Sequence, residues 1–247
     1  MDIDAEPFIG WTRTGTAHID HFQVMGERRS GTNFAEQLFE TNLRARRVES
    51  YGWKHGMPTM AYIKPSALII VVIREAFDWL GSLHNRPFAK SHGGLAMSDF
   101  LRKEWYEIYR PGHFGVKTIF GTIPKVAETA NQVDRHPITG KRFRDVFELR
   151  AVKAEASLGY LNRECNAVIL RYHDLSRNPV GMVRAVTKTF GLALRQADVA
   201  TVGLVGPKGF SKTRLRRDDM SADDITYVQS RLNRNLETSM GFEDTFR

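Results

Sequence analysis

The sequence contains a single cysteine, Cys165, so no disulfide bond can form within the chain. It also lacks a long apolar run. Its most hydrophobic segment, residues 67–73, is far shorter than the ~20 residues that a membrane-spanning helix needs. No basic region followed by an apolar stretch opens the chain, so nothing indicates a secretory signal. These absences predict a cytoplasmic location and no membrane span.

Internal repeats, linkers and low-complexity tracts are absent too, and 42% hydrophobic with 26% charged residues is a typical globular composition. The length predicts one domain over residues 1–247, with an N-terminal arm at 1–19 and a basic flap at 203–220. His18 and His21 have a metal-binding spacing, but no ligand cluster adjoins them. We therefore expect no metal site.

Acidic residues are in the minority, with 28 Asp and Glu against 36 Lys and Arg, which gives a net charge of +8. Such a chain favours anions, which include nucleic acid, acidic membranes, acidic polysaccharides and multiply phosphorylated cofactors. The net charge alone does not show which of these anions the protein binds. In the basic flap, Lys208, Lys212, Arg214, Arg216 and Arg217 are expected to cover a bound anion. A solvated loop explains any single one of them equally well.

One stretch organises the chain. Residues 26–33, Gly-Glu-Arg-Arg-Ser-Gly-Thr-Asn, follow a short apolar run and open a helical pattern. Gly26 and Gly31 let the turn curl back on itself, and the first helical N–H groups point at whatever lies above it. Ser30 and Thr32 add hydroxyl groups. The stretch predicts a phosphate-binding turn, although an ordinary strand-to-helix turn with solvated arginines is the alternative.

The spacing of the two glycines matches the Walker P-loop, but the residues that follow them do not. Thr32 and Asn33 stand where that motif has Lys and then Ser or Thr, so the hydroxyl ligand of Mg²⁺ is missing. Arg28 and Arg29 supply positive charge from inside the turn instead. The turn therefore predicts anion binding that does not require a metal ion.

Strand and helix patterns alternate along the rest of the chain. Continuous apolar runs at 67–73 and 167–170 predict buried strands of a parallel sheet, and a shorter strand is expected within 44–51. Apolar spacing and end signals predict helices at 34–43, 77–87, 98–109, 143–161, 179–194 and 221–240. This alternation predicts an α/β fold with a central, mostly parallel sheet flanked by helices.

Arg74 ends the central apolar run at the sheet edge where ligands bind in open α/β folds. The turn at 26–33 lies at the same edge, so we expect two anion sites to converge in one crevice. Ser82 follows eight positions later on the expected helix, where an exposed serine is the alternative. Lys54 and His55 are expected in a loop near the crevice, broken by glycine and proline.

Five segments, in order, resemble those of sulfotransferases that use 3′-phosphoadenosine 5′-phosphosulfate (PAPS), and they cover residues 22–242. They are Arg29-Ser30-Gly31-Thr32-Asn33-Phe34, Lys54-His55-Gly56-x-Pro58, Val72-Ile73-Arg74-Glu75-x-x-Asp78-Trp79-x-x-Ser82, Leu170-Arg171-Tyr172-His173-Asp174-Leu175 and Leu236-Glu237-x-x-x-Gly241-Phe242. The segments at 29–34 and 72–82 are specific together. Two positions depart from the family pattern: Arg29 replaces a lysine, and His173 stands where a glutamate is common.

The resemblance implies PAPS as the donor and 3′-phosphoadenosine 5′-phosphate (PAP) as the product, with no metal. The 5′-phosphosulfate is expected to contact Arg28, Arg29, Ser30, Gly31, Thr32, Asn33 and Phe34. Arg74 and Ser82 are implied to hold the 3′-phosphate. His55 is implied as the base, Arg29 as the group that stabilises the leaving phosphate, and Lys54 as a second cation.

The expected acceptor is a carbohydrate or another small molecule with a hydroxyl group, rather than nucleic acid. Candidate pocket residues are aromatic or histidine side chains that could equally belong to the core, namely Trp53, Trp79, His84, Trp105 and Tyr106. Two alternatives remain. A P-loop kinase fits the glycine spacing but needs the missing lysine and magnesium ligand. A non-enzymatic binder of nucleic acid or acidic polysaccharide fits the charge, although no nucleic-acid module is recognisable.

Overall fold

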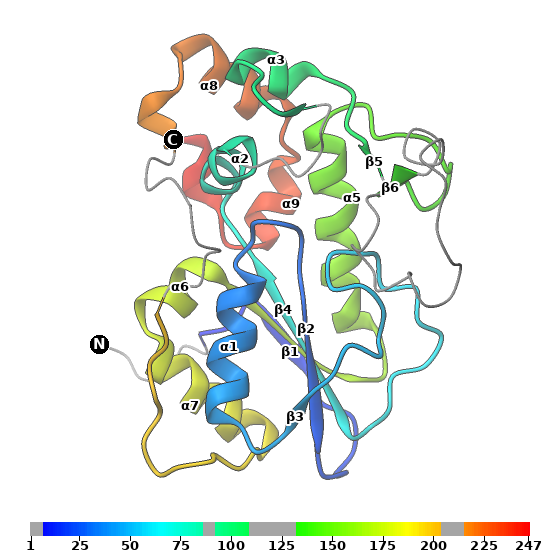
Figure 1. Cartoon of the computed structure of the whole chain (residues 1–247), viewed down its shortest axis with the longest axis vertical. Helices are drawn as coiled ribbons and strands as arrows, with labels where there is room; N and C mark the ends of the chain where they lie inside the picture. Colours follow the sequence, from blue (N-terminus) through cyan, green and yellow to red (C-terminus); the bar gives the residue numbers. More distant parts are fainter. Residues whose placement is uncertain (1–6, 86–91, 109–131, 204–214) are drawn as a thin grey trace.

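The computed structural model describes residues 7–85, 92–108, 132–203 and 215–247, and it shows a central sheet flanked by helices (Figure 1). The sheet has the strand order β1-β7-β4-β2-β3. Its strands are β1 (Gly10–Thr12), β2 (His21–Met25), β3 (Arg46–Arg47), β4 (Ala67–Ile73) and β7 (Asn166–Arg171). Only β1 runs antiparallel to its neighbour. The α/β fold with a mixed, mostly parallel sheet confirms the fold class expected from the alternating pattern.

β4 is the centre of the sheet, and all seven of its residues are buried. It pairs in parallel with β2 on one side and with β7 on the other. Because successive strand residues point to opposite faces, its continuous apolar sequence supplies two separate cores. Leu68, Ile70 and Val72 belong to one core, whereas Ile69 and Val71 belong to the other.

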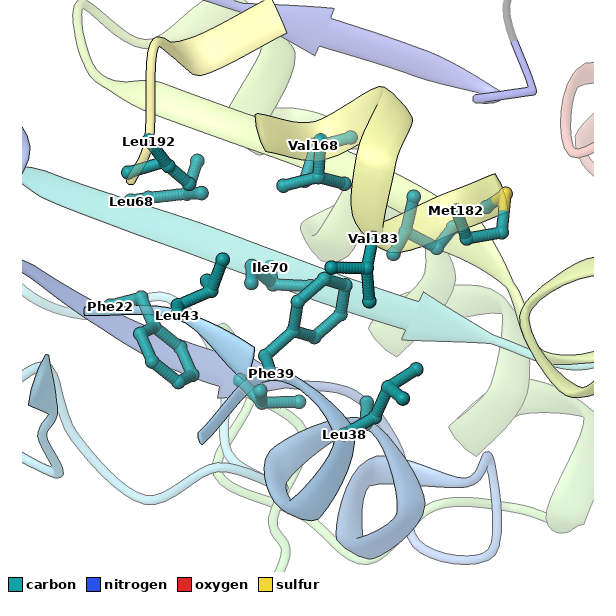
Figure 2. Close-up of a cluster of buried hydrophobic side chains, with 14 of the residues drawn as sticks. Phe22, Leu38, Phe39, Leu43, Leu68, Ile70, Val168, Met182, Val183 and Leu192 are labelled. Carbon is teal, nitrogen blue, oxygen red and sulfur yellow. The ribbon is translucent and has the colours of Figure 1, made fainter. Parts of the chain in front are cut away.

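The helices α1 (Thr32–Asn42) and α7 (Pro179–Phe190) cover the first face, and the short α6 (Tyr172–Arg177) connects β7 to α7. Figure 2 shows the packing, in which side chains from both helices meet those of the strands. The labelled members of this core are Phe22, Leu38, Phe39, Leu43, Leu68, Ile70, Val168, Met182, Val183 and Leu192. This packing fixes the start of α1 relative to the end of β2.

The second face is covered by α5 (Val146–Leu158) and the 3₁₀ helix η3 (Gly159–Asn162). Asp145 caps α5, and its carboxylate accepts hydrogen bonds from the backbone N–H groups of Phe147 at 3.0 Å and Glu148 at 2.8 Å. Such a cap fixes where the helix begins. α5 therefore starts at Val146, three residues later than expected, while Phe143 pairs with Trp105 instead.

A third group of helices lies beyond the carboxyl ends of β2 and β4, at the top of Figure 1. It contains α2 (Ala76–Asn85), α3 (Met97–Arg102), α8 (Ala222–Arg231) and α9 (Arg234–Ser239). The remaining elements are β5 (Glu107–Ile108), β6 (Gln132–Val133), η4 (Arg217–Asp219) and η5 (Glu243–Phe246). Trp79, Phe100 and Val228 share a core there, so α2 is anchored beside the sheet edge.

The helix expected at 98–109 is wrong over most of its length. α3 ends at Arg102, and Lys103 already has an extended backbone. Trp105 then exchanges backbone hydrogen bonds with Phe143 and is buried. The aromatic spacing reflected burial of individual side chains rather than one face of a helix.

The helix expected at 221–240 is two helices. Ser221 caps α8 as its sequence indicated, but the backbone becomes extended at Leu232. Asn233 then caps α9 by accepting from the N–H of Leu236 at 3.2 Å. Asparagine is a favoured N-cap residue, which explains why a second helix starts here. Gly241, in the left-handed region, follows α9 as expected.

Smaller differences between the predicted and observed bounds occur at other elements. The arm expected at 1–19 includes β1, and the strand expected within 44–51 is only β3. α7 ends at Phe190 rather than near 194, because Gly191 adopts the left-handed conformation that ends helices. Of the expected flap, residues 204–214 lie outside the described residues, and with them Lys208, Lys212 and Arg214. None of the described helices combines the length and apolarity needed to cross a bilayer.

Candidate functional site

The turn at 26–33 joins β2 to α1, and its backbone needs glycine at two places. Gly26 has φ 150° and Gly31 has φ 104°. A Cβ atom at Gly26 would lie 2.4 Å from the carbonyl oxygen of Val72, and one at Gly31 would lie 2.1 Å from the Tyr172 ring. Arg29 also has a positive φ, of 68°. The expected curl is therefore present, held tightly against β4 and α6.

Two polar features of the turn, the Ser30 hydroxyl and the start of α1, lack the hydrogen-bond partners that such groups usually find among the described residues. Ser30 is only 2% exposed, and its hydroxyl has no hydrogen-bond partner among the residues that the structure describes. Gly31 is the N-cap of α1, so no side chain caps the first N–H groups of this helix. Buried polar groups normally find partners, and helix N-termini bind anions. Both features suit an oxyanion inside the turn.

Arg74, which directly follows β4, and side chains of α2 hold the turn from the other side. The indole N–H of Trp79 donates to the carbonyl of Arg28 at 2.8 Å, and Arg74 Nη1 donates to the carbonyl of Arg29 at 2.9 Å. Arg29 Nε donates to the Ser82 hydroxyl at 3.0 Å. The structure thus brings together Arg29, Arg74 and Ser82, although Ser82 contacts Arg29 rather than Arg74.

The backbone of Arg74 is fixed by a buried ion pair. Arg150 on α5 donates to the Arg74 carbonyl at 3.0 Å and pairs with Glu237 on α9 at 2.6 Å. Burial alone would lower the pKa of Arg150, but the charge and hydrogen bond of Glu237, together with the charge of Glu75, outweigh it, and the pKa is raised. The guanidinium of Arg74 also lies 4.7 Å from the Tyr172 ring. Three segments distant in sequence therefore orient this arginine.

The loop with His55 runs along the turn. The N–H of Gly26 donates to the carbonyl of Lys54 at 2.9 Å, and Nδ1 of His55 lies 2.8 Å from the carbonyl of Gly26. Because a carbonyl can only accept, this contact assigns the proton to Nδ1 and leaves Nε2 as the acceptor nitrogen. The ring of Trp53 meets the imidazole edge-on at 5.5 Å.

The pKa of His55 is lowered to about 3, first by desolvation and then by the positive charges of Arg28, Lys54 and Lys153. The hydrogen bond with Gly26 opposes this shift but does not cancel it. This value lies well below the unperturbed imidazole pKa of ~6.5. At neutral pH the ring is therefore neutral, and it is a weak base in this environment.

Sequence reasoning missed a buried charge cluster beside His55. Lys153 on α5 pairs with Glu27 at 2.6 Å and with Asp134 at 2.5 Å, and it donates to the His55 carbonyl at 2.7 Å. Asp134 also lies 3.6 Å from Arg28. The available signal was the place of Lys153, four residues after Leu149 on the apolar side of a predicted helix.

Other predicted residues lie around the turn with different partners. Lys54 pairs with Glu36 at 2.6 Å and donates to Asn33 at 2.7 Å, so it lies over the first turn of α1. Phe34 is buried and packs edge-on against Tyr172. The candidate pocket residues Trp79 and Trp105 are 1% exposed and belong to the core.

A comparison of the chain with protein-family models, with curated proteins and with solved structures finds no match. In the part of the chain that the structure describes, no group of three or more His, Cys, Asp or Glu side chains could hold a metal ion. Chemically, the site combines a helix N-terminus, a buried hydroxyl and several cations with a neutral imidazole. These groups can bind an anion and accept a proton.

Proposed function

We propose that this protein is a PAPS-dependent sulfotransferase, which moves a sulfuryl group to a hydroxyl of a carbohydrate or another small molecule. The resemblance of the five segments suggests the reaction. The observation that carries the proposal is the convergence of the uncapped turn, with its buried Ser30 hydroxyl, and Arg74 on one side of the sheet edge. PAPS carries negative charge at two separate places, so its binding needs two such anion sites.

The turn is a P-loop-like site in this proposal. Ser30 and the first N–H groups of α1 bind the 5′-phosphosulfate, and Arg74 with Ser82 binds the 3′-phosphate. Arg29, whose Nε already contacts Ser82 at 3.0 Å, stabilises charge on the leaving phosphate. Lys212 and Arg214, which lie outside the described residues, remain donor contacts predicted from the sequence alone.

Sulfuryl transfer resembles phosphoryl transfer, in which positioning and charge stabilisation dominate. The acceptor oxygen forms a bond to sulfur while the bond between sulfur and the bridging phosphate oxygen breaks. His55 Nε2 takes the proton of the acceptor hydroxyl. The negative charge of a bound donor opposes the positive charges that disfavour protonation of His55. The imidazole therefore becomes a stronger base when the donor is bound.

The experiment is a calorimetric titration with PAP and with its analogue that lacks the 3′-phosphate. We expect wild type to prefer PAP, and Arg74→Ala to lose roughly 10- to 100-fold in affinity for PAP alone. Arg231→Ala, which removes an arginine paired with Asp145 at the start of α5, is the matched control. Equal loss for both ligands would show that Arg74 does not bind that phosphate.

Transfer of labelled sulfate from PAPS to a panel of acceptors then tests the reaction. Activity that survives removal of divalent metal supports the sulfotransferase. Loss of activity with chelator, restored by Mg²⁺, supports the P-loop kinase that the glycine spacing also fits. Binding of nucleic acid or acidic polysaccharide without any transfer would favour the non-enzymatic alternative.

A further inference from the structure

Lys153 is an ammonium group buried at the meeting point of four segments that lie far apart in the sequence. Its side chain is 4% exposed. It contacts Glu27 of the turn at 2.6 Å, Asp134 at 2.5 Å and the backbone carbonyl of His55 at 2.7 Å. The ammonium thus makes one hydrogen bond, to the His55 carbonyl, and two ion pairs.

The arrangement holds His55 at two points. Lys153 binds its backbone carbonyl, and the carbonyl of Gly26 binds its ring at Nδ1 at 2.8 Å. Because Glu27 follows Gly26 directly, the same ammonium also ties down the turn that supplies this ring contact. The loop and the turn cannot separate without breaking contacts to Lys153.

Stability alone is a poor explanation for this cluster. Two carboxylates, Glu27 and Asp134, and two cations, Arg28 and Lys153, lie together with side chains at most 13% exposed. Burying such groups costs desolvation that packed apolar side chains would avoid. Asp134 also occupies a left-handed backbone conformation, with φ 62°, which is unfavourable for most non-glycine residues. Such costs are commonly accepted where a group must be held for function.

We propose that Lys153 is a positioning residue that fixes the His55 loop against the turn, and so presents Nε2 of His55 as the proton acceptor. Asp134 and Glu27 hold the ammonium in place for this purpose. The role in catalysis rests on the proposed function, but the fixed imidazole is a property of the folded protein alone. Lys153 itself touches neither substrate in this proposal.

The test compares wild type with two variants. Lys153→Met removes the ammonium but leaves two buried carboxylates without it, so this variant is expected to fold poorly. The double variant Lys153→Met/Asp134→Asn removes one charge of each sign and leaves Glu27 and Arg28 to balance each other. Arg231→Met/Asp145→Asn is the matched control, because it breaks a different ion pair at the start of α5, where asparagine still caps the helix.

Nitrogen NMR of the imidazole measures the tautomer and the protonation of His55 without any substrate. In wild type and in the control we expect the Nδ1–H tautomer and no protonation from about pH 8 down to about pH 5. In the double variant we expect mixed tautomers and titration closer to the ordinary value of ~6.5, because the released loop hydrates the ring. Turnover should fall roughly 100-fold, which is more than the loss of donor affinity.

A well-folded double variant whose His55 keeps the tautomer and titration of wild type would overturn the proposal, because Lys153 would then only add stability. If wild type transfers no sulfate to any acceptor, the proposed function fails instead. The imidazole spectra still decide the positioning role in that case, so the two failures are distinguishable.

Discussion

At the scale of single residues, the imidazole of His55 links structure to pH dependence. The folded protein without donor lowers its pKa to about 3, through desolvation and three neighbouring cations. The negative charge of a bound donor opposes the cations, so we expect the pKa to rise when the donor binds. Only neutral imidazole accepts a proton, so with saturating donor the rate should fall as pH decreases through this raised value. We expect this acid limb between about pH 3 and about pH 6.5.

Kinetics of sulfate transfer across pH measure this limb. His55→Ala should lower turnover by roughly 10²- to 10⁴-fold, abolish the limb and leave donor affinity nearly unchanged. His173→Ala, which changes an exposed histidine on α6, is the control and should behave as wild type. A folded His55→Ala protein with near-normal turnover would remove His55 from the mechanism.

At the scale of elements, the junction of β2 and α1 depends on Gly31. An alanine there must adopt φ 104° and places its Cβ atom 2.1 Å from the Tyr172 ring, so either the turn or α6 has to move. We expect Gly31→Ala to lower the free energy of unfolding by about 1 to 3 kcal/mol and to weaken anion binding in the turn.

Chemical denaturation and PAP titration measure the two effects. Gly159→Ala is the matched control, because Gly159 has a right-handed helical backbone and open space at its Cβ position. It should be neutral or slightly stabilising. Unchanged stability and binding in Gly31→Ala would show that the turn accommodates a side chain easily.

Elements with strong local signals were predictable from the sequence. The bounds of β4 at 67–73 are those of the apolar run, because burial on both faces requires every residue to be apolar. Prediction failed where distant contacts decide the outcome. The helix expected at 98–109 stops because Trp105 pairs with Phe143, 38 positions away along the chain. The local spacing of apolar residues does not indicate such a distant partner.

At the scale of the whole molecule, one part of the candidate site was predictable from the sequence and another part was not. The turn and Arg74 were found because each follows a strand, and strand ends meet at one sheet edge. The Lys153 cluster was missed because it joins α5 to a loop 98 positions earlier. Its charged side chains interact only after folding brings them together, so no local sequence pattern could predict the pairing.

The C-terminal helices are coupled to the candidate site through one buried ion pair. Glu237 on α9 holds Arg150, which in turn donates to the carbonyl of Arg74 at 3.0 Å. Glu237→Gln leaves a buried guanidinium without its counter-charge, so we expect the free energy of unfolding to fall by about 3 kcal/mol. Asp244→Asn is the control, because its pair with Arg247 is 82% exposed and should contribute less than about 1 kcal/mol. Urea denaturation of both variants measures the difference, and equal small losses would show that α9 does not support the site.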